Sequence, residues 1–162
     1  MKVIGIDPGT ASCGYGIVRE SDGRLEAIDH GWWKTAAGER PELRLKTIFD
    51  GVAGLITEHR PDAVALEESF VGADARTALF VGQARGAVLV AAANGGIECA
   101  EYPPARVKQV VCGYGRAEKE QVQKMVKAIL SMQAAPTPLH ASDALAVAIC
   151  HALAPPLLRI AG

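Results

Sequence analysis

The sequence lacks the features that mark membrane proteins, disulfide-rich proteins and zinc-binding proteins. No uninterrupted apolar run is long enough to span a bilayer, and Met1 leads directly into a strand-like segment without a basic and apolar leader. The four cysteines are scattered without a Cys-x-x-Cys pair, which disfavours thiolate metal sites and disulfide frameworks and favours buried free thiols. We therefore expect a cytoplasmic protein with no membrane partner.

The chain also has few aromatic residues and almost no net charge. Phe, Trp and Tyr make up 5% of the chain, so aliphatic side chains must supply most of the packing. The formal net charge of -1 neither favours nor excludes a nucleic-acid partner. Binding of nucleic acid depends on the local distribution of charge. Hydrophobic residues, in contrast, make up 49% of the 162 positions. This predicts a single domain, 1–162, with a substantial core.

Short apolar segments and amphipathic segments follow one another in an order typical of an α/β domain. Strands are predicted at 3–6, 14–19, 25–33, 62–67 and 97–102, with Asp22-Gly23 as a hairpin turn between the second and the third. Helices are predicted at 41–60, 75–94, 103–111, 122–130 and 142–153. The order predicts a five-stranded mixed sheet with helices on both faces.

Two of the predicted strands end in a carboxylate. Asp7 follows the first strand and precedes the turn residues Pro8-Gly9, and Glu67 ends the fourth strand. Acidic side chains on rigid strand ends suit metal ligation. A turn role for Asp7, and a solvated pair of Glu67 with Glu68, are the simpler alternatives.

A third acidic position lies at the start of the last helix. His140 and Asp143 are three residues apart and so share a helix face, although Asp143 could be a first-turn residue beside a capping Ser142, and His140 a loop residue. If this end of the helix meets the strand ends, Asp7, Glu67, His140 and Asp143 converge. Clustered carboxylates repel unless they share a proton or cation, and oxygen ligands favour magnesium or manganese. Two ions about 3.5–4 Å apart could clamp both oxygens of a phosphodiester displacement.

Several motifs, taken together, resemble one family. They are Gly5-Ile-Asp-Pro-Gly-Thr10, Gly14-Tyr-Gly16, Ala65-Leu-Glu67, Gly82-Gln-Ala-Arg-Gly86, Val107-Lys-Gln109 and Ala144-Leu-Ala146. In this order, over nearly the whole chain, the set is similar to the RuvC family of bacterial Holliday junction resolvases. The Asp-Pro-Gly-Thr turn alone also occurs in ATPases related to actin and sugar kinases, but those proteins use two lobes and this chain has one such turn.

The resemblance implies an RNase H-like fold and a homodimeric, magnesium-dependent endonuclease that nicks four-way DNA junctions symmetrically in recombination and repair. It implies in-line attack by a metal-activated water, ligatable 5′-phosphate ends, and a RuvA–RuvB complex as a possible partner. The family's metal-binding and catalytic cluster maps onto Asp7, Glu67, His140 and Asp143, with two Mg²⁺ ions. His140 stands where many members have Asp. Since imidazole binds manganese better than magnesium, His140 either tunes metal preference or transfers a proton or contacts the phosphate.

The segment from 106 to 127 is rich in basic residues. Arg106, Lys108, Arg116, Lys119, Lys124 and Lys127 could follow a phosphate backbone, although a solvated helix face is the alternative for the last two. The resemblance favours Lys108 and Lys119 as DNA-binding residues, with Arg116 beside them and Arg76 and Arg85 as further candidates. Phe70 could stack on an unpaired base at the crossover or pack in the core, and the resemblance favours stacking, which makes Phe70 a candidate DNA-binding residue. A junction binder without nuclease activity is disfavoured by the acidic set, while a different DNA or RNA substrate stays open.

Overall fold

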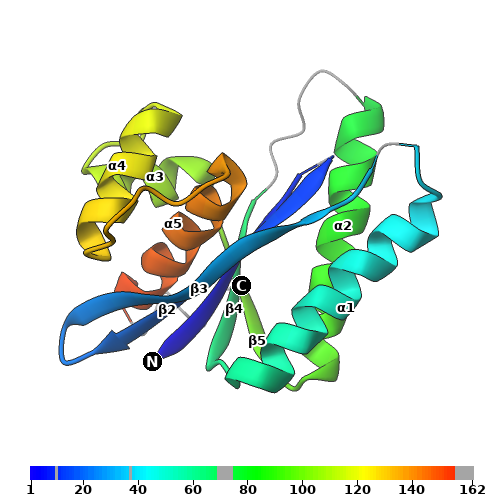
Figure 1. Ribbon diagram of the computed structural model, residues 1–162, viewed down its shortest axis with the longest axis horizontal. Coiled ribbons are helices and arrows are strands. Elements are labelled where there is room, and N and C mark those ends of the chain that lie inside the picture. The colour runs from blue at the N-terminus through cyan, green and yellow to red at the C-terminus, as the bar shows by residue number, and fades with distance from the viewer. Residues whose placement is uncertain (10, 37, 69–74, 156–162) are drawn as a thin grey trace.

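A computed structural model describes residues 1–9, 11–36, 38–68 and 75–155 of the chain (Figure 1). The strands are β1 (Lys2–Pro8), β2 (Ser12–Ser21), β3 (Arg24–Lys34), β4 (Ala63–Glu67) and β5 (Glu98–Tyr102). The helices are α1 (Pro41–His59), α2 (Ala75–Asn94), α3 (Pro104–Cys112), α4 (Lys119–Ile129) and α5 (Leu139–Leu153). Each segment predicted as a strand or a helix is confirmed.

The strands form one mixed sheet in the order β3-β2-β1-β4-β5. The first three strands pair antiparallel, whereas β4 pairs parallel to both β1 and β5. Ile6 of β1 is the register partner of Leu66 of β4, so the residues that follow them, Asp7 and Glu67, come side by side at one edge of the sheet. The predicted fold class, an α/β sheet of mixed strand direction, is confirmed.

Helices cover both faces of the sheet (Figure 1). On one face, β1 and β4 side chains such as Ile4 and Leu66 pack with α1 and α2. On the other face, Val3 and Ala65 pack with α3, α4 and α5. Alternate residues of a strand point to opposite faces, which explains how neighbours in β1 belong to different cores. In the part of the chain that the structure describes, no helix is both long and apolar enough to cross a membrane.

Helix α5 rests directly on the backbone of β1 and β2. A Cβ atom built on Gly5 would lie 2.0 Å from the Ala144 carbonyl oxygen, and one on Gly14 would lie 2.1 Å from the His140 carbonyl oxygen. Side-chain Cβ atoms essentially never approach other atoms that closely, so these positions require glycine. The lack of side chains at Gly5 and Gly14 lets the N-terminal part of α5 pack close to the strand ends.

A β-bulge interrupts the pairing of β2 with β3. Val18 pairs with Ala27 and Ile17 pairs with Asp29, so Ile28 is an extra residue in β3. A bulge shifts the alternation of side chains in the strand that contains it. Beyond the bulge, Trp32 is the partner of Gly14 and Trp33 the partner of Cys13.

Candidate active site

The four predicted site residues come from three elements. Asp7 and Glu67 lie at the ends of the neighbouring parallel strands β1 and β4, His140 lies in the first turn of α5, and Asp143 follows that turn. The predicted start of this helix at Ser142 is wrong, because α5 begins at Leu139 directly after Pro138. Ser142 is therefore a buried helical residue and not the N-cap, and His140 is helical rather than a loop residue.

The acidic side chains and two lysines line one cleft of about 170 Å³. Asp7, Glu67 and Asp143 supply its carboxylates, and Lys108 and Lys119 supply its positive charges. Its apolar wall is formed by Pro104, Val107, Val122 and Ala146. His140 stands beside the cleft, with Nδ1 at 2.7 Å from Oδ2 of Asp7. The structure thus brings together all four residues that the sequence predicted as the site.

Burial and mutual repulsion raise the proton affinity of the carboxylates. Burial is the main cause that raises the pKa of Glu67 to about 7, and the charges of Asp7 and Asp143 add to it. The pKa of Asp143 is also raised, first by burial and then by Asp7, while Lys119 acts in the opposite direction. Negative charge is therefore costly in this cleft, and a cation that enters it is strongly favoured.

Lys119 and His140 lie next to these acids. Nζ of Lys119 lies 3.3 Å from Oδ2 of Asp143, and the charge of Asp143 is the main cause that raises the pKa of Lys119. The hydrogen bond to Asp7 is the main cause that raises the pKa of His140, against the opposing effect of burial. Since an ionised carboxylate only accepts, the imidazole donates Nδ1–H to Asp7.

The chemistry of the donors suits a hard divalent cation. Three carboxylates share the cleft, and oxygen ligands of this kind are those that Mg²⁺ and Mn²⁺ prefer. Among the described residues, no three His, Cys, Asp or Glu side chains are yet close enough to hold one ion together. Oδ2 of Asp7 is hydrogen-bonded to His140, and Oδ2 of Asp143 is hydrogen-bonded to Lys119.

A covalent nucleophile is not supported next to Asp7. Cys13 is buried, and burial is the main cause that raises the pKa of its thiol, with Asp7 adding to the effect. A thiol that stays protonated is a poor nucleophile. The acids, and not the cysteine, carry the chemistry that this cleft can support.

The other predicted DNA-binding residues lie in different surroundings. Arg116 is exposed in the loop between α3 and α4, and Arg76 is exposed in the first turn of α2. Arg85 instead pairs with Glu101 of β5 at 2.6 Å and is mostly covered, so its charge is already used within the fold. Phe70 lies outside the residues that the structure describes.

Some residues that shape the site were not predicted. The apolar wall, Val107 and Val122 above all, could not be separated from ordinary core residues in the sequence. Gly5 and Gly14 belong to the motifs that suggested the family, but their contact with α5 was not foreseen. Glycine within β-branched strands, where it is disfavoured, was the available signal.

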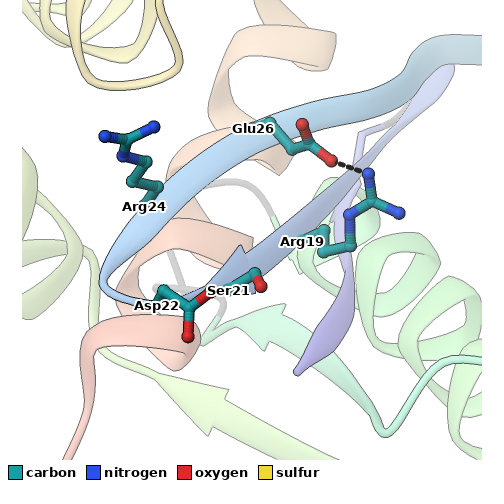
Figure 2. Close-up of a pocket in the computed structure, with 5 residues that line it drawn as sticks. All are labelled: Arg19, Ser21, Asp22, Arg24 and Glu26. Atoms are coloured by element: carbon teal, nitrogen blue, oxygen red, sulfur yellow. Dashed lines mark ion pairs between the residues drawn. The ribbon is translucent and has the colours of Figure 1, made fainter.

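A larger hollow of about 640 Å³ lies at the tip of the β2–β3 hairpin and is unrelated to the acids. Figure 2 shows its lining, in which Arg19 is ion-paired with Glu26 and Arg24 points away from that pair. Arg19 is the register partner of Lys2, at the opposite end of β1 from Asp7. Its acids, Asp22 and Glu26, are accompanied by two arginines, and none of its lining residues lines the cleft.

The sheet order and the acidic cleft at the ends of β1 and β4 define a domain of the RNase H-like class. The family model described as crossover junction endodeoxyribonuclease RuvC matches residues 3–151. The chain belongs to the RuvC family.

Relatives and solved structures agree with this assignment. The chain is 52% identical over 151 residues to a crossover junction endodeoxyribonuclease RuvC from Syntrophomonas wolfei. The aligned region covers 93% of this chain and 88% of that relative. It is similar to the structure of Thermus thermophilus RuvC, with a TM-score of 0.86, 41% identity, and 94% and 93% of the two chains covered. A structure of Thermus thermophilus RuvC in complex with Holliday junction substrate gives a TM-score of 0.86 and 38% identity over the same shares of the two chains.

Proposed function

We propose that this protein resolves Holliday junctions as a structure-selective endodeoxyribonuclease of homologous recombination and DNA repair. It cuts four-way DNA junctions by symmetric paired nicks, hydrolyses phosphodiester bonds with divalent metal ions, and leaves 5′-phosphate ends. The observation that carries this function is the convergence of Asp7, Glu67 and Asp143 in one cleft next to Lys108 and Lys119. Membership of the RuvC family, and the junction complex of the Thermus thermophilus protein, support it.

In this proposal Asp7, Glu67, His140 and Asp143 are the catalytic and metal-binding residues for two Mg²⁺ ions, with Mn²⁺ as a substitute. When bound, such ions lower the pKa of a water and stabilise the charge that develops on the phosphate. The strands hold Asp7 and Glu67 in place, and α5 holds Asp143. Lys119 and Lys108 neutralise the cleft and attract the phosphate before it reaches the acids.

His140 has two possible roles at this site. Its imidazole could bind a metal ion, in which case it shifts the preference from magnesium towards manganese. Alternatively, the imidazole, whose pKa is raised chiefly by its hydrogen bond to Asp7, could donate a proton or a hydrogen bond to the phosphate. We favour the first role, which the metal-preference experiment in the Discussion tests.

We propose that DNA is held by Lys108, Lys119, Arg116 and Arg76, with Phe70 stacking on an unpaired base at the crossover. The raised pKa of Lys119 keeps this side chain charged at the cleft. The exposed positions of Arg116 and Arg76 are compatible with contacts to phosphates further along the arms. A chromosomal DNA substrate would place the protein in the cytoplasm, with a RuvA–RuvB branch-migration complex as a possible partner.

We further propose that residues 1–162 form a single nuclease domain and that two copies form a homodimer through α2. Symmetric nicks need two active sites, and α2 offers a face suited to close helix packing. Cβ atoms on Gly82 and Gly86 would meet nothing within 4 Å, and the neighbouring Leu79 is 66% exposed. Small residues flanked by apolar ones let two helices approach closely.

The function is tested with a synthetic four-way junction and Mg²⁺, beside a linear duplex and an RNA–DNA hybrid of matching sequence. We expect paired, symmetric nicks in the junction with 5′-phosphate ends, and no cutting of the other two substrates. The Asp7→Asn variant should bind the junction without cutting it. Full junction cutting by Asp7→Asn, or equal cutting of the linear duplex, would contradict the proposal.

A further inference from the structure

An exposed tryptophan beside the cleft has no part in the chemistry described so far. Trp32 belongs to the edge strand β3 and is 52% exposed. Its register partner is Gly14, and directly opposed residues of antiparallel strands point to the same face of the sheet. Since a Cβ on Gly14 would meet the His140 backbone, this face is the one that carries the first turn of α5. Trp32 therefore stands one strand away from the backbone of His140.

The neighbouring tryptophan shows what a structural role looks like in this strand. Trp33 points to the opposite face, where its ring stacks on Tyr15 at a centroid distance of 4.9 Å. It also packs against α1, because a Cβ on Gly51 would lie 2.3 Å from Trp33 Cε2. Packing accounts for Trp33, whereas Trp32 leaves half of a large apolar surface in water on the face that carries the site.

The surroundings of Trp32 favour nucleic acid as its partner. Lys34, two residues further on the same face, is exposed and makes no ion pair within the described ranges. In the sheet, β4 with Glu67 lies on one side of β1, and β2 and β3 with Trp32 lie on the other. A DNA strand bound at the acids has to leave the cleft in two directions. Lys108 and Lys119 of α3 and α4 serve one direction, and β3 borders the other.

We propose that Trp32 is a DNA-binding residue, whose indole packs against a nucleotide of the junction on the β3 side of the acidic cleft. Lys34 contacts the adjacent phosphate. Aromatic rings stack on any base because every base has a π-face, so the contact adds affinity without sequence preference. This inference rests on the proposed junction-cutting function and adds a contact on the side of the cleft opposite to the lysines.

Binding of a labelled four-way junction in EDTA separates this contact from catalysis. We expect Trp32→Ala to raise the Kd about tenfold and Trp32→Phe to keep most of the affinity, because stacking needs an aromatic ring. Ile28→Ala is the matched control, since Ile28 is also exposed, at 37%, on the same strand but nearer the hairpin. Its Kd should equal that of the wild type.

Fluorescence gives a second reading that does not depend on affinity. The chain has two tryptophans, so Trp32→Phe leaves only the packed Trp33. Junction DNA should quench the wild-type emission and leave that of Trp32→Phe nearly unchanged. If the wild type binds the junction but the Kd of Trp32→Ala is unchanged, the proposed role of Trp32 is wrong. Equal quenching of Trp32→Phe and the wild type has the same meaning, and neither result affects the proposed function. Failure of the wild type to bind the junction overturns the proposed function as well.

Discussion

Glu67 is a site carboxylic acid whose pKa the fold raises strongly. Its pKa rises from an ordinary 4.5 to about 7, so the folded protein holds this proton more tightly than the unfolded chain does. Between these two values the folded state binds more protons, and the free energy of unfolding falls as pH rises. Above about pH 7 the full cost of the buried charge is present.

Replacing Glu67 by Gln should therefore stabilise the metal-free protein at high pH. We expect the free energy of unfolding to rise by about 1–3 kcal/mol at pH 8 and to change little at pH 4, because the charge is absent there. Urea denaturation in EDTA at both pH values measures this, and Glu68→Gln, at the exposed neighbour, is the control. An equal effect at the two pH values would count against the buried charge.

The His140→Asp variant tests whether His140 sets the metal preference. A carboxylate offers the oxygen ligand that Mg²⁺ prefers, so the ratio of magnesium-supported to manganese-supported cleavage should increase several-fold. Initial cleavage rates of the junction across a titration of each metal give this ratio. If the ratio stays that of the wild type, His140 acts through the proton or the phosphate instead.

The candidate site residues could be predicted from the sequence, but their environment could not. Asp7 and Glu67 could be found because they end apolar segments, and His140 and Asp143 because of their spacing and of the resemblance to the family. The high pKa of Glu67 could not be predicted, since its burial arises only when β1, β4 and α5 assemble. The pairing of Arg85 with Glu101 likewise needs α2 and β5 in contact, which no local pattern reveals.

At the scale of elements, the position of α5 depends on glycines in β1 and β2, which have no Cβ atom to clash with the helix backbone. Gly14→Ala places a Cβ within 2.1 Å of the His140 carbonyl oxygen, so the first turn of α5 has to shift. We expect a loss of at least about 1–3 kcal/mol in the free energy of unfolding and a large loss of junction cleavage. Denaturation curves and cleavage assays of the same preparation measure both effects.

Gly54 of α1 provides the matched control for this substitution. A Cβ there meets nothing within 4 Å, so Gly54→Ala should raise stability by about 0.5–1 kcal/mol through helix propensity. Its cleavage rate should be that of the wild type. A Gly14→Ala protein as stable and active as Gly54→Ala would show that α5 does not need the glycine contact.

Helices and strands were predictable because the apolar pattern and the turn residues agree along most of the chain. Asp22-Gly23, for example, forms the hairpin turn between β2 and β3 as its composition indicates. The start of α5 was placed three residues late because Ser142 is a typical capping residue, whereas Pro138 takes the N-cap position. The close contact of α5 with the sheet could not be predicted, since it joins segments far apart in the chain.

At the scale of the whole molecule, the proposed paired nicks need two active sites, which the proposed dimer would supply. The double variant Gly82→Ala/Gly86→Ala adds two methyl groups that meet no atom within 4 Å in one chain. Each alanine should favour the isolated helix by about 1 kcal/mol, yet both should hinder close approach of a second α2. We therefore expect a folded protein with a raised dimer dissociation constant in sedimentation equilibrium.

Gly54→Ala again serves as the control, since α1 is not part of the proposed interface. The double variant should also change the products, giving single nicks in place of coordinated pairs. Unchanged dimerisation of the double variant would exclude the small-residue face of α2, and a wild type that stays monomeric at working concentrations would exclude the dimer itself.

The bulge at Ile28 decides which of two adjacent indoles belongs to the interior. Ile28 is the unpaired residue of β3, and every side chain after it has its facing fixed by that single insertion. If Ile28 were instead paired in the ladder while the hairpin end of β3 kept its register, the rest of the strand would turn over. Trp33 would then lie on the face of the sheet that carries α5, and Trp32 would lie on the face that carries Tyr15. One residue without a ladder partner thus orients an entire strand end with respect to the substrate.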